Sequence, residues 1–373
     1  MSEEKQISVE NFSVTSNVAA DVWHEKPNSE AYEWWYFDAL SEDGRDAVVV
    51  IFLDNFIFSP RYNKAVQNSK FQIPNSKIES DSETQNFPAV AFTYYRDGKP
   101  KYRAINEFPI EDFSASAEKP ECRISENSFR LERASYGSGY VVSIDATLQK
   151  NFHLKANFEW LSVESDFMPD RKMSVSGANT HSWNLAVSRA DVTGRVSISD
   201  AGGKDSDVVH FRGTGYHDHN FDNRWLPETV SDWQWGRAHF ADATAVFYRY
   251  KELAASEPTT KIFIVKDDNL NEANAVCEEQ KFKRDIFGIR YPKRLDFSTE
   301  DGARLEIKQS KIIDASFFYL RFLSEMTLTL PDGKRRETVG ITEYLKPKAL
   351  KYRWLDWLVN MRIGRGGKGS FLP

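Results

Sequence analysis

Short segments in which apolar and polar residues alternate follow one another along nearly the whole chain. Because successive side chains of a strand point to opposite faces of a sheet, this period of two predicts β-strands rather than helices. Dipeptides such as Asp97-Gly98 and Asp301-Gly302 separate several segments and favour tight hairpins. The expected strands are 33–40, 46–56, 90–95, 140–148, 153–161, 181–189, 208–216, 233–240, 244–250, 261–266, 303–309, 318–330 and 337–344.

Many short strands and few helical segments predict an all-β protein built from antiparallel barrels or sandwiches. The chain has 373 residues, more than one ordinary core accommodates, so two such domains are expected. Pro227 and nearby charged residues interrupt the strand pattern, which places the boundary between domains over 15–225 and 226–345. The polar stretches 63–86 and 164–179 are predicted to be long loops.

Residues 346–373 form a separate C-terminal segment with its own charge pattern. Between 346 and 368 it holds seven Lys or Arg and one acid, whereas the whole chain has a net charge of −6. Helical spacing on one face is shared by Trp354, Trp357, Leu358 and Met361. A basic amphipathic helix with apolar tryptophans predicts a short C-terminal helix in peripheral contact with a membrane. The alternative is a helix packed on the second domain, and in either case the catalytic groups upstream of Tyr344 are expected to survive its removal.

Composition narrows the class of partner. Aromatic residues make up 14% of the chain, and aromatic side chains line apolar ligand sites, so a hydrophobic small molecule is the expected partner. No basic domain indicates nucleic acid, and Cys122 and Cys277 are too far apart in sequence for a zinc ribbon or a disulfide framework. The polar N-terminus has no apolar signal region, and no apolar run is long enough to span a membrane. A cytoplasmic protein, with peripheral membrane contact as an option, is expected.

The densest set of ionisable and aromatic groups lies between Gly213 and Asn220. On a strand, Tyr216, Asp218 and Asn220 share one face, and His217 and His219 share the other. A carboxyl that faces an aromatic pocket loses hydration, which disfavours its charged form and raises its pKa. Asp218 could then remain protonated near neutral pH and act as a general acid. In the alternative interpretation it caps a turn or pairs with an arginine such as Arg237.

His181 and Trp183 share a face of another predicted strand, and Trp235 lies in the motif that follows. The rings of Trp183 and Trp235 could stabilise a developing cation. This set suits protonation of an electron-rich carbon–carbon double bond, followed by capture of the cation by water or by the substrate itself. A metal site would require several histidines to converge, which the spacing does not show. No metal is therefore expected, and hydrogen bonding is expected of His217 and His219.

Four motifs resemble those of the carotenoid 1,2-hydratase family. They are Tyr32-Glu-Trp-Trp-Tyr-Phe-Asp38, His181-Ser-Trp183, Gly215-Tyr-His-Asp-His-Asn220 and Trp233-Gln-Trp-Gly-Arg237. The resemblance covers about 33–344 and implies two lipocalin-like β-barrel domains. It also implies a cofactor-independent hydro-lyase that adds water to a terminal isoprenoid double bond, with Asp218 as proton donor beside Tyr216, His181 and Trp183. The remaining motif residues are candidates for substrate binding: Glu33, Trp35, Trp233, Trp235 and Arg237.

Three functions stay open from the sequence. The first is an acid-catalysed hydratase or cyclase that acts on an isoprenoid or polyene. The second is a pericyclase of the Diels–Alderase type, a class related to the same group, in which Asp218 would polarise a carbonyl. The third is a non-catalytic, lipocalin-like binder, for which Asp218 would be dispensable. Sequence does not separate the first two, because both require the same pocket. After Asn220 the chain reads Phe-Asp-Asn-Arg-Trp instead of the family's usual Asn-Trp-Gly, which leaves the substrate undetermined.

Overall fold

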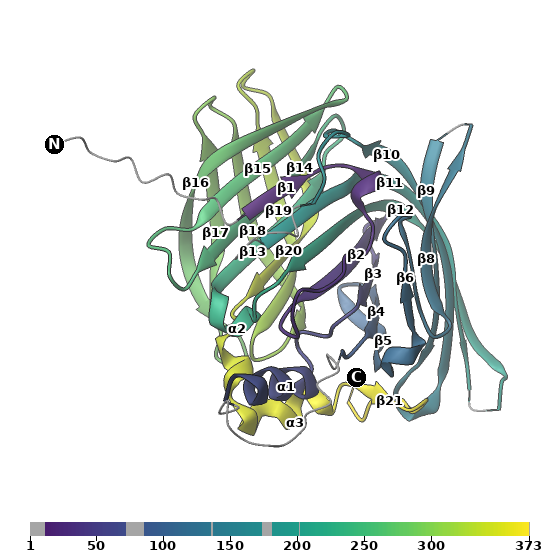
Figure 1. The fold of residues 1–373 in the computed structure, drawn as a ribbon. Helices are drawn as coiled ribbons and strands as arrows, with labels where there is room; N and C mark the ends of the chain where they lie inside the picture. The colour runs from purple at the N-terminus through teal and green to yellow at the C-terminus, as the bar shows by residue number, and fades with distance from the viewer. Residues whose placement is uncertain (1–11, 72–85, 136, 174–180, 201, 373) are drawn as a thin grey trace.

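The computed structural model describes residues 12–71, 86–135, 137–173, 181–200 and 202–372, which build two large β-sheets with few helices. Figure 1 shows the sheets beside each other, the first mostly in purple to teal and the second in green to yellow-green. Each strand expected from the alternating pattern overlaps an observed strand, although the strands observed over His181–Ser199 and Asp205–Asp222 are much longer than the expected 181–189 and 208–216. The predicted all-β fold, made of antiparallel sheets and a short C-terminal helix, is confirmed.

The first sheet has 13 strands and curls around its own apolar core. Its order is β21-β5-β4-β3-β2-β12-β11-β10-β9-β8-β7-β6, and β1 pairs in parallel with β11. The strands are β1 Phe12–Thr15, β2 Tyr32–Ser41, β3 Asp46–Leu53, β4 Ala89–Arg96, β5 Lys99–Glu107, β6 Phe113–Ala115, β7 Glu121–Ile124, β8 Asn127–Ala134, β9 Gly137–Thr147, β10 His153–Ser165, β11 His181–Ser199, β12 Asp205–Asp222 and β21 Gly364–Arg365. On β2, Trp35 and Phe37 belong to this core, whereas Trp34 and Tyr36 belong to a cluster shared with the second sheet.

The second sheet is a closed barrel of β13 to β20 in sequence order, in which β20 pairs back with β13. Its strands are β13 Val230–His239, β14 Thr244–Glu252, β15 Thr259–Lys266, β16 Asn269–Arg284, β17 Arg290–Thr299, β18 Arg304–Ala315, β19 Tyr319–Thr329 and β20 Arg335–Leu345. Phe247, Phe297 and Leu305 are buried in one of its apolar clusters. The short helix α2, Leu226–Thr229, links β12 to β13, so the chain changes sheet around Pro227.

Two segments differ from the expectation of long loops and a separable tail. Part of the first polar stretch forms helix α1, Pro60–Phe71, while residues 72–85 and 174–180 lie outside the described part. In the C-terminal segment, only Asp356–Asn360 is α-helical (α3), after the 3₁₀ turns Pro347–Lys351 and Arg353–Leu355. Among the described residues, no helix is long and apolar enough to cross a membrane.

The C-terminal segment is built into the fold. Its first turn packs against α1, α2 and β13, and α3 packs against α1. Figure 1 shows α1, α2 and α3 gathered at one end of the molecule. The chain then returns to the first sheet, where β21 pairs in parallel with β5. The segment therefore contacts both sheets, rather than packing on the second alone.

Strand β12 carries a buried ion network on the face that points into the first core. His219 Nε2 lies 2.7 Å from Glu33 Oε1, and its Nδ1 lies 3.1 Å from Asp21 Oδ1. His217 Nε2 lies 2.8 Å from the other oxygen of Asp21, and His24 Nδ1 lies 2.6 Å from Glu33 Oε1. Since β12 and β2 are antiparallel neighbours, the network ties these two strands to the segment that precedes β2.

The network places a positive charge on His219 between two carboxylates. Burial alone lowers the pKa of His219, but Glu33 and Asp21 outweigh burial and raise that pKa to about 9. Burial would raise the pKa of Asp21, yet His217 and His219 hold it well below its usual range. Trp35 stacks on His219 at 4.7 Å between ring centroids, and Phe37 stacks on His217 at 3.8 Å. The prediction that these histidines form hydrogen bonds rather than line a pocket agrees with this placement.

We expect His219→Gln to lower the free energy of unfolding by about 3–5 kcal/mol at neutral pH, because it leaves buried carboxylates unpaired. The folded-state pKa of His219 lies above the unfolded value of about 6.5. The protonated histidine therefore contributes fully to the free energy of unfolding below about pH 6.5. The contribution is lost as the pH rises through about 9. Urea denaturation at several pH values should therefore show the difference from wild type shrinking at alkaline pH. His153→Gln, which breaks the more exposed pair with Asp145, is the control and should change stability by at most about 1 kcal/mol.

Candidate active site

A cavity of about 290 Å³ lies where side chains of the first sheet face those of the barrel. Strands β2 and β12 contribute to one side, and β13, β19 and β20 contribute to the other. Its lining includes Trp34, Tyr36, Asp218, Asn220, Trp233, Trp235, Arg321 and Glu343. The cavity thus combines an apolar aromatic wall with a few ionisable groups, as binding sites for small apolar molecules do.

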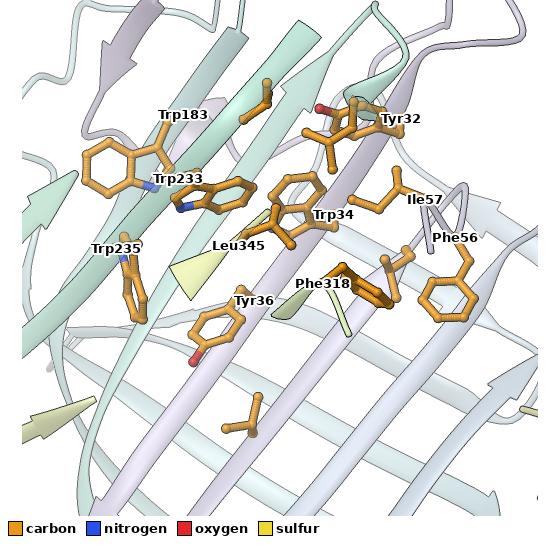
Figure 2. Packing of buried hydrophobic residues seen from close by; sticks show 14 of the residues in the cluster. Tyr32, Trp34, Tyr36, Phe56, Ile57, Trp183, Trp233, Trp235, Phe318 and Leu345 are labelled. Atoms are coloured by element: carbon orange, nitrogen blue, oxygen red, sulfur yellow. The ribbon is translucent and has the colours of Figure 1, made fainter. Parts of the chain in front are cut away.

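The aromatic wall joins the two sheets. Trp34 of β2 stacks on Trp233 of β13, with ring centroids 5.5 Å apart and planes 12° apart. Tyr36 of β2 meets Trp235 of β13 edge to face at 5.2 Å. Figure 2 shows both pairs side by side, with Trp183 next to Trp233. Ring faces on this wall can stabilise a cation held in the cavity.

Asp218 is one of the acids that line the cavity and is only 4% exposed. Its Oδ2 accepts hydrogen bonds from the Tyr216 hydroxyl at 2.8 Å and from Trp183 Nε1 at 3.0 Å. Its Oδ1 accepts one from Asn220 Nδ2 at 2.9 Å. Within the described part of the chain, every donor to Asp218 is neutral. The expected sharing of a face by Tyr216, Asp218 and Asn220 is what the structure shows.

Burial is the largest cause that raises the pKa of Asp218, which reaches about 7. The hydrogen bonds from Trp183 and Tyr216 oppose that rise, whereas the negative charges of Glu343 and Asp38 add to it. A carboxyl with this pKa is half protonated near neutral pH, so it can donate a proton and take one back.

Arg237 does not pair with Asp218, so the alternative interpretation of Asp218 is wrong on this point. Its Nε donates to Asp38 Oδ1 at 2.8 Å, and its Nη2 contacts the same oxygen. The hydroxyl of Tyr36 donates to Asp38 Oδ2 at 2.9 Å. The Arg237–Asp38 pair is fully buried and links β13 to β2, so it holds the sheets together rather than lining the cavity.

His181 lies behind the cavity wall, in an aromatic stack. Its Nε2 is 2.5 Å from the Tyr248 hydroxyl, and its ring is parallel to that of Tyr250 at 4.9 Å. Trp183 contacts Tyr248 at 5.0 Å, so His181 reaches Asp218 through Tyr248 and Trp183. Tyr248 carries no signal in the sequence motifs, because its strand, β14, lies outside them.

Of the five residues expected to bind substrate, two line the cavity and three do not. Trp233 and Trp235 line the cavity, while Arg237 lies beside it. Glu33 and Trp35 point to the opposite face of β2, into the ion network and the first core. Trp34 and Tyr36 face the cavity in their place, since a strand turns alternate residues to opposite faces.

The histidines of the ion network could also hold a metal on distance alone. His24, Glu33 and His219 each offer a ligand atom, and these atoms lie within 4.8 Å of one another. A metal ligand must be a deprotonated nitrogen, however, and both nitrogens of His219 face carboxylates that favour its protonated form. The donor set fits an ion network better than a metal site, and the absence of a metal stays a prediction.

Comparison with known proteins agrees with this geometry. Residues 141–371 match the family model of carotenoid hydratase CrtC. A relative from Chlorobaculum tepidum, named hydroxyneurosporene dehydrogenase, is 27% identical over 365 residues, which cover 96% of this chain and 94% of the relative.

Two solved structures have a similar fold. The crystal structure of CghA has a TM-score of 0.56 at 13% identity, over 90% of this chain and 93% of CghA. An AttH candidate of Nitrosomonas europaea has a TM-score of 0.54 at 13% identity, over 89% of this chain and 97% of that protein. At such identity these likenesses concern the fold alone. The family match spans more than half of the chain, and the protein therefore belongs to the carotenoid hydratase family.

Proposed function

We propose that the protein is a cofactor-independent hydratase that adds water to a double bond of a hydrophobic isoprenoid or polyene. The observation that carries the proposal is a buried carboxyl, Asp218, with a pKa of about 7 on the wall of an aromatic cavity. Membership of the carotenoid hydratase family supports a carotenoid substrate, as does the hydroxyneurosporene in the name of the C. tepidum relative.

In this reaction Asp218 donates its proton to one carbon of the double bond. Oδ2 already accepts two hydrogen bonds and Oδ1 only one, so the proton is best carried by Oδ1. Positive charge develops on the other alkene carbon, where the rings of Trp233, Trp235 and Tyr36 stabilise it. Water then adds to that carbon and releases a proton.

The neighbours of Asp218 act mainly on its ionised form. Tyr216 and Trp183 donate hydrogen bonds that strengthen once the carboxylate has given up its proton. His181 fixes Tyr248, which packs on Trp183 and so orients the indole N–H. These residues therefore position the acid and limit the rise of its pKa.

Replacing the acid gives the most direct test. Asp218→Asn should lower the rate of hydration by about 10²–10⁴-fold, because an amide keeps the shape but cannot donate an acidic proton. Quenching of tryptophan fluorescence by substrate should show that binding persists. Asp145→Asn, which removes a carboxylate of β9 outside the cavity, is the matched control.

Oxygen from labelled water separates the hydratase from the other two functions. A pericyclase would form product without incorporating it, and a binder would form no product. Wild-type turnover by Asp218→Asn would contradict the role of the acid.

The rate should also depend on the protonation of Asp218. Only the protonated form donates, so kcat should fall as the pH rises through about 7. Trp183→Phe removes a hydrogen bond that lowers the pKa of Asp218, and the fall should therefore move to higher pH. A pH–rate profile of both proteins checks this, and an unshifted profile in Trp183→Phe would speak against Trp183 acting through Asp218.

We further propose that the cavity opens toward an anionic membrane surface. Three half-buried lining residues, Phe287, Leu358 and Leu372, each follow directly after an exposed apolar residue. These exposed residues are Ile286 (90% exposed), Trp357 (56%) and Phe371 (73%). Side chains of this kind at a cavity rim could enter the interface of a bilayer, from which an apolar substrate would reach the cavity.

The charge of the same segments favours an anionic partner. Arg353 and Lys368 are exposed next to the aromatic residues of the C-terminal segment. Lys283, Arg284 and Arg290 are exposed on either side of Ile286, at the tip of the β16–β17 hairpin. Each cation near an anionic leaflet contributes about 1 kcal/mol, which salt screens.

Truncation is not a clean test, because Leu358, Arg362 and Leu372 line the cavity. The sequence predicts that the catalytic groups survive removal of the segment, but these lining residues argue against their independence from it. The double variant Ile286→Ser/Trp357→Ser should instead weaken association with phosphatidylglycerol vesicles by about tenfold or more. Turnover of a detergent-solubilised substrate should persist. Val276→Ser, about 30 Å along β16 from the hairpin tip, is an exposed apolar control. Equal, salt-independent sedimentation of all variants with the vesicles would contradict the proposal that these residues bind a membrane.

A further inference from the structure

Besides Asp218, the cavity lining contains the carboxyl group of Asp314 on β18, which lies 3.0 Å from Arg103 Nη2, and that of Glu343 on β20. The cross-strand neighbour of Glu343 is Trp235, and the ring of Trp235 contacts that of Tyr36. The cross-strand neighbour of Tyr36 is in turn Asp218. Glu343 and Asp218 therefore stand at either end of one row of residues along the cavity wall. They also interact through space, because the charge of Glu343 contributes, after burial, to the raised pKa of Asp218.

Glu343 is held differently from Asp218. Arg321 Nε donates to Glu343 Oε1 at 2.8 Å, and Arg321 Nη2 lies at the same distance from that oxygen. Arg321 is itself buried, and its Nη1 donates to the Tyr95 hydroxyl at 3.0 Å. Both arginine contacts use Oε1, and the Tyr319 hydroxyl is a further polar group beside Glu343, which adds to burial in raising the pKa of that hydroxyl. A water in the cavity would donate to Oε2.

Among the described residues, the cavity lining thus holds one carboxyl without a cationic partner, Asp218, and two carboxylates paired with arginine, of which Glu343 is the one that contributes to the raised pKa of Asp218. Two carboxyl groups in unlike surroundings can divide the work of acid and base. Hydration needs both, since the alkene must gain a proton and the attacking water must lose one. We propose that Glu343 is the base that accepts the proton of the water that captures the carbocation. This inference rests on the proposed hydratase function.

The proposed step balances. Asp218 transfers its proton to the alkene and becomes a carboxylate, and the substrate becomes a carbocation. A water molecule hydrogen-bonded to Glu343 Oε2 forms the carbon–oxygen bond, and its proton passes to Glu343. The product is a tertiary alcohol. Transfer of that proton from Glu343 to Asp218, through a second water, restores both groups, and no oxidant or reductant is involved.

The roles of the two acids separate in deuterated water. With lycopene in detergent micelles as substrate, Asp218→Asn should lose both hydration and exchange of the alkene hydrogen. Glu343→Gln should lose at least about 100-fold in hydration, within the range for removing a general base. It should still exchange that hydrogen, since the cation can return its proton to Asp218. Mass spectrometry of alcohol and recovered alkene measures both reactions.

Two further variants guard against a structural effect. Glu337→Gln removes a carboxylate of the same strand that pairs with Arg335 at the surface, and it should hydrate at the wild-type rate. Glu343→Asp keeps a carboxylate and should recover part of the hydration that Glu343→Gln loses. In Glu343→Gln the alkaline fall of the exchange rate should move to lower pH, because a negative charge near Asp218 has been removed. The charged groups that remain in the cavity lining and the wall behind it are Asp38, Arg237, Arg321, Asp314, Arg103 and Arg362.

The experiment distinguishes failure of the proposed role of Glu343 from failure of the hydratase function. Hydration by Glu343→Gln within about threefold of wild type would overturn the proposal. A folded Glu343→Gln that loses exchange together with hydration would also overturn it, because Glu343 would then serve binding or protonation. Failure of the hydratase function itself has another signature: wild-type protein would incorporate neither deuterium nor water into the substrate.

Discussion

The buried ion network between β12 and β2 is the constraint on which the site depends. His219 sits between Glu33 and Asp21, and a shift of strand register would separate this buried histidine from both carboxylates, which is costly. Because side chains alternate, a slip of one residue would turn His217 and His219 toward the cavity and bury Asp218 in the first core. The network therefore fixes which face of β12 carries the acid. Asp218 lies between His217 and His219 in the sequence, but its side chain points to the opposite face of β12, so its position depends on the network.

A second set of contacts holds the two sheets at the spacing that makes the cavity. The Arg237–Asp38 pair and the Trp34–Trp233 stack both run from β2 to β13. Asp38 lies two residues beyond Tyr36 on the same face of β2. The ion pair with Arg237 and the aromatic wall of the cavity are therefore neighbours along one strand. The electrostatics follow from this arrangement: Arg237 neutralises Asp38, while Asp218, one strand away, is left with neutral donors and a raised pKa.

Sequence predicts the strands whose one face is buried, and it predicts the alternation on β12, because charged and aromatic residues there differ between faces. It does not tell which face of β2 lines the cavity. Tyr32 to Asp38 is buried on both faces, so the pattern gives two sets of residues without saying which is which. That is why Glu33 and Trp35 were expected in the site in place of Trp34 and Tyr36. Strand β16 escaped prediction because much of it is exposed and polar, as in Glu278 and Lys281.

Glu343 and Arg321 could not be found from sequence, because an ion pair on two antiparallel strands has no fixed spacing. The proposed role of Glu343 depends on its surroundings in the folded protein. In water the carboxyl of Asp218 would have a pKa near 4. In the cavity, Asp218 has lost its hydration without gaining a cation, whereas Glu343 has Arg321 beside it. The wall that excludes water is completed by Val359 and Leu372 of the C-terminal segment. A segment that sequence marks as a surface tail thus helps to set the dielectric in which an ordinary aspartate becomes an acid.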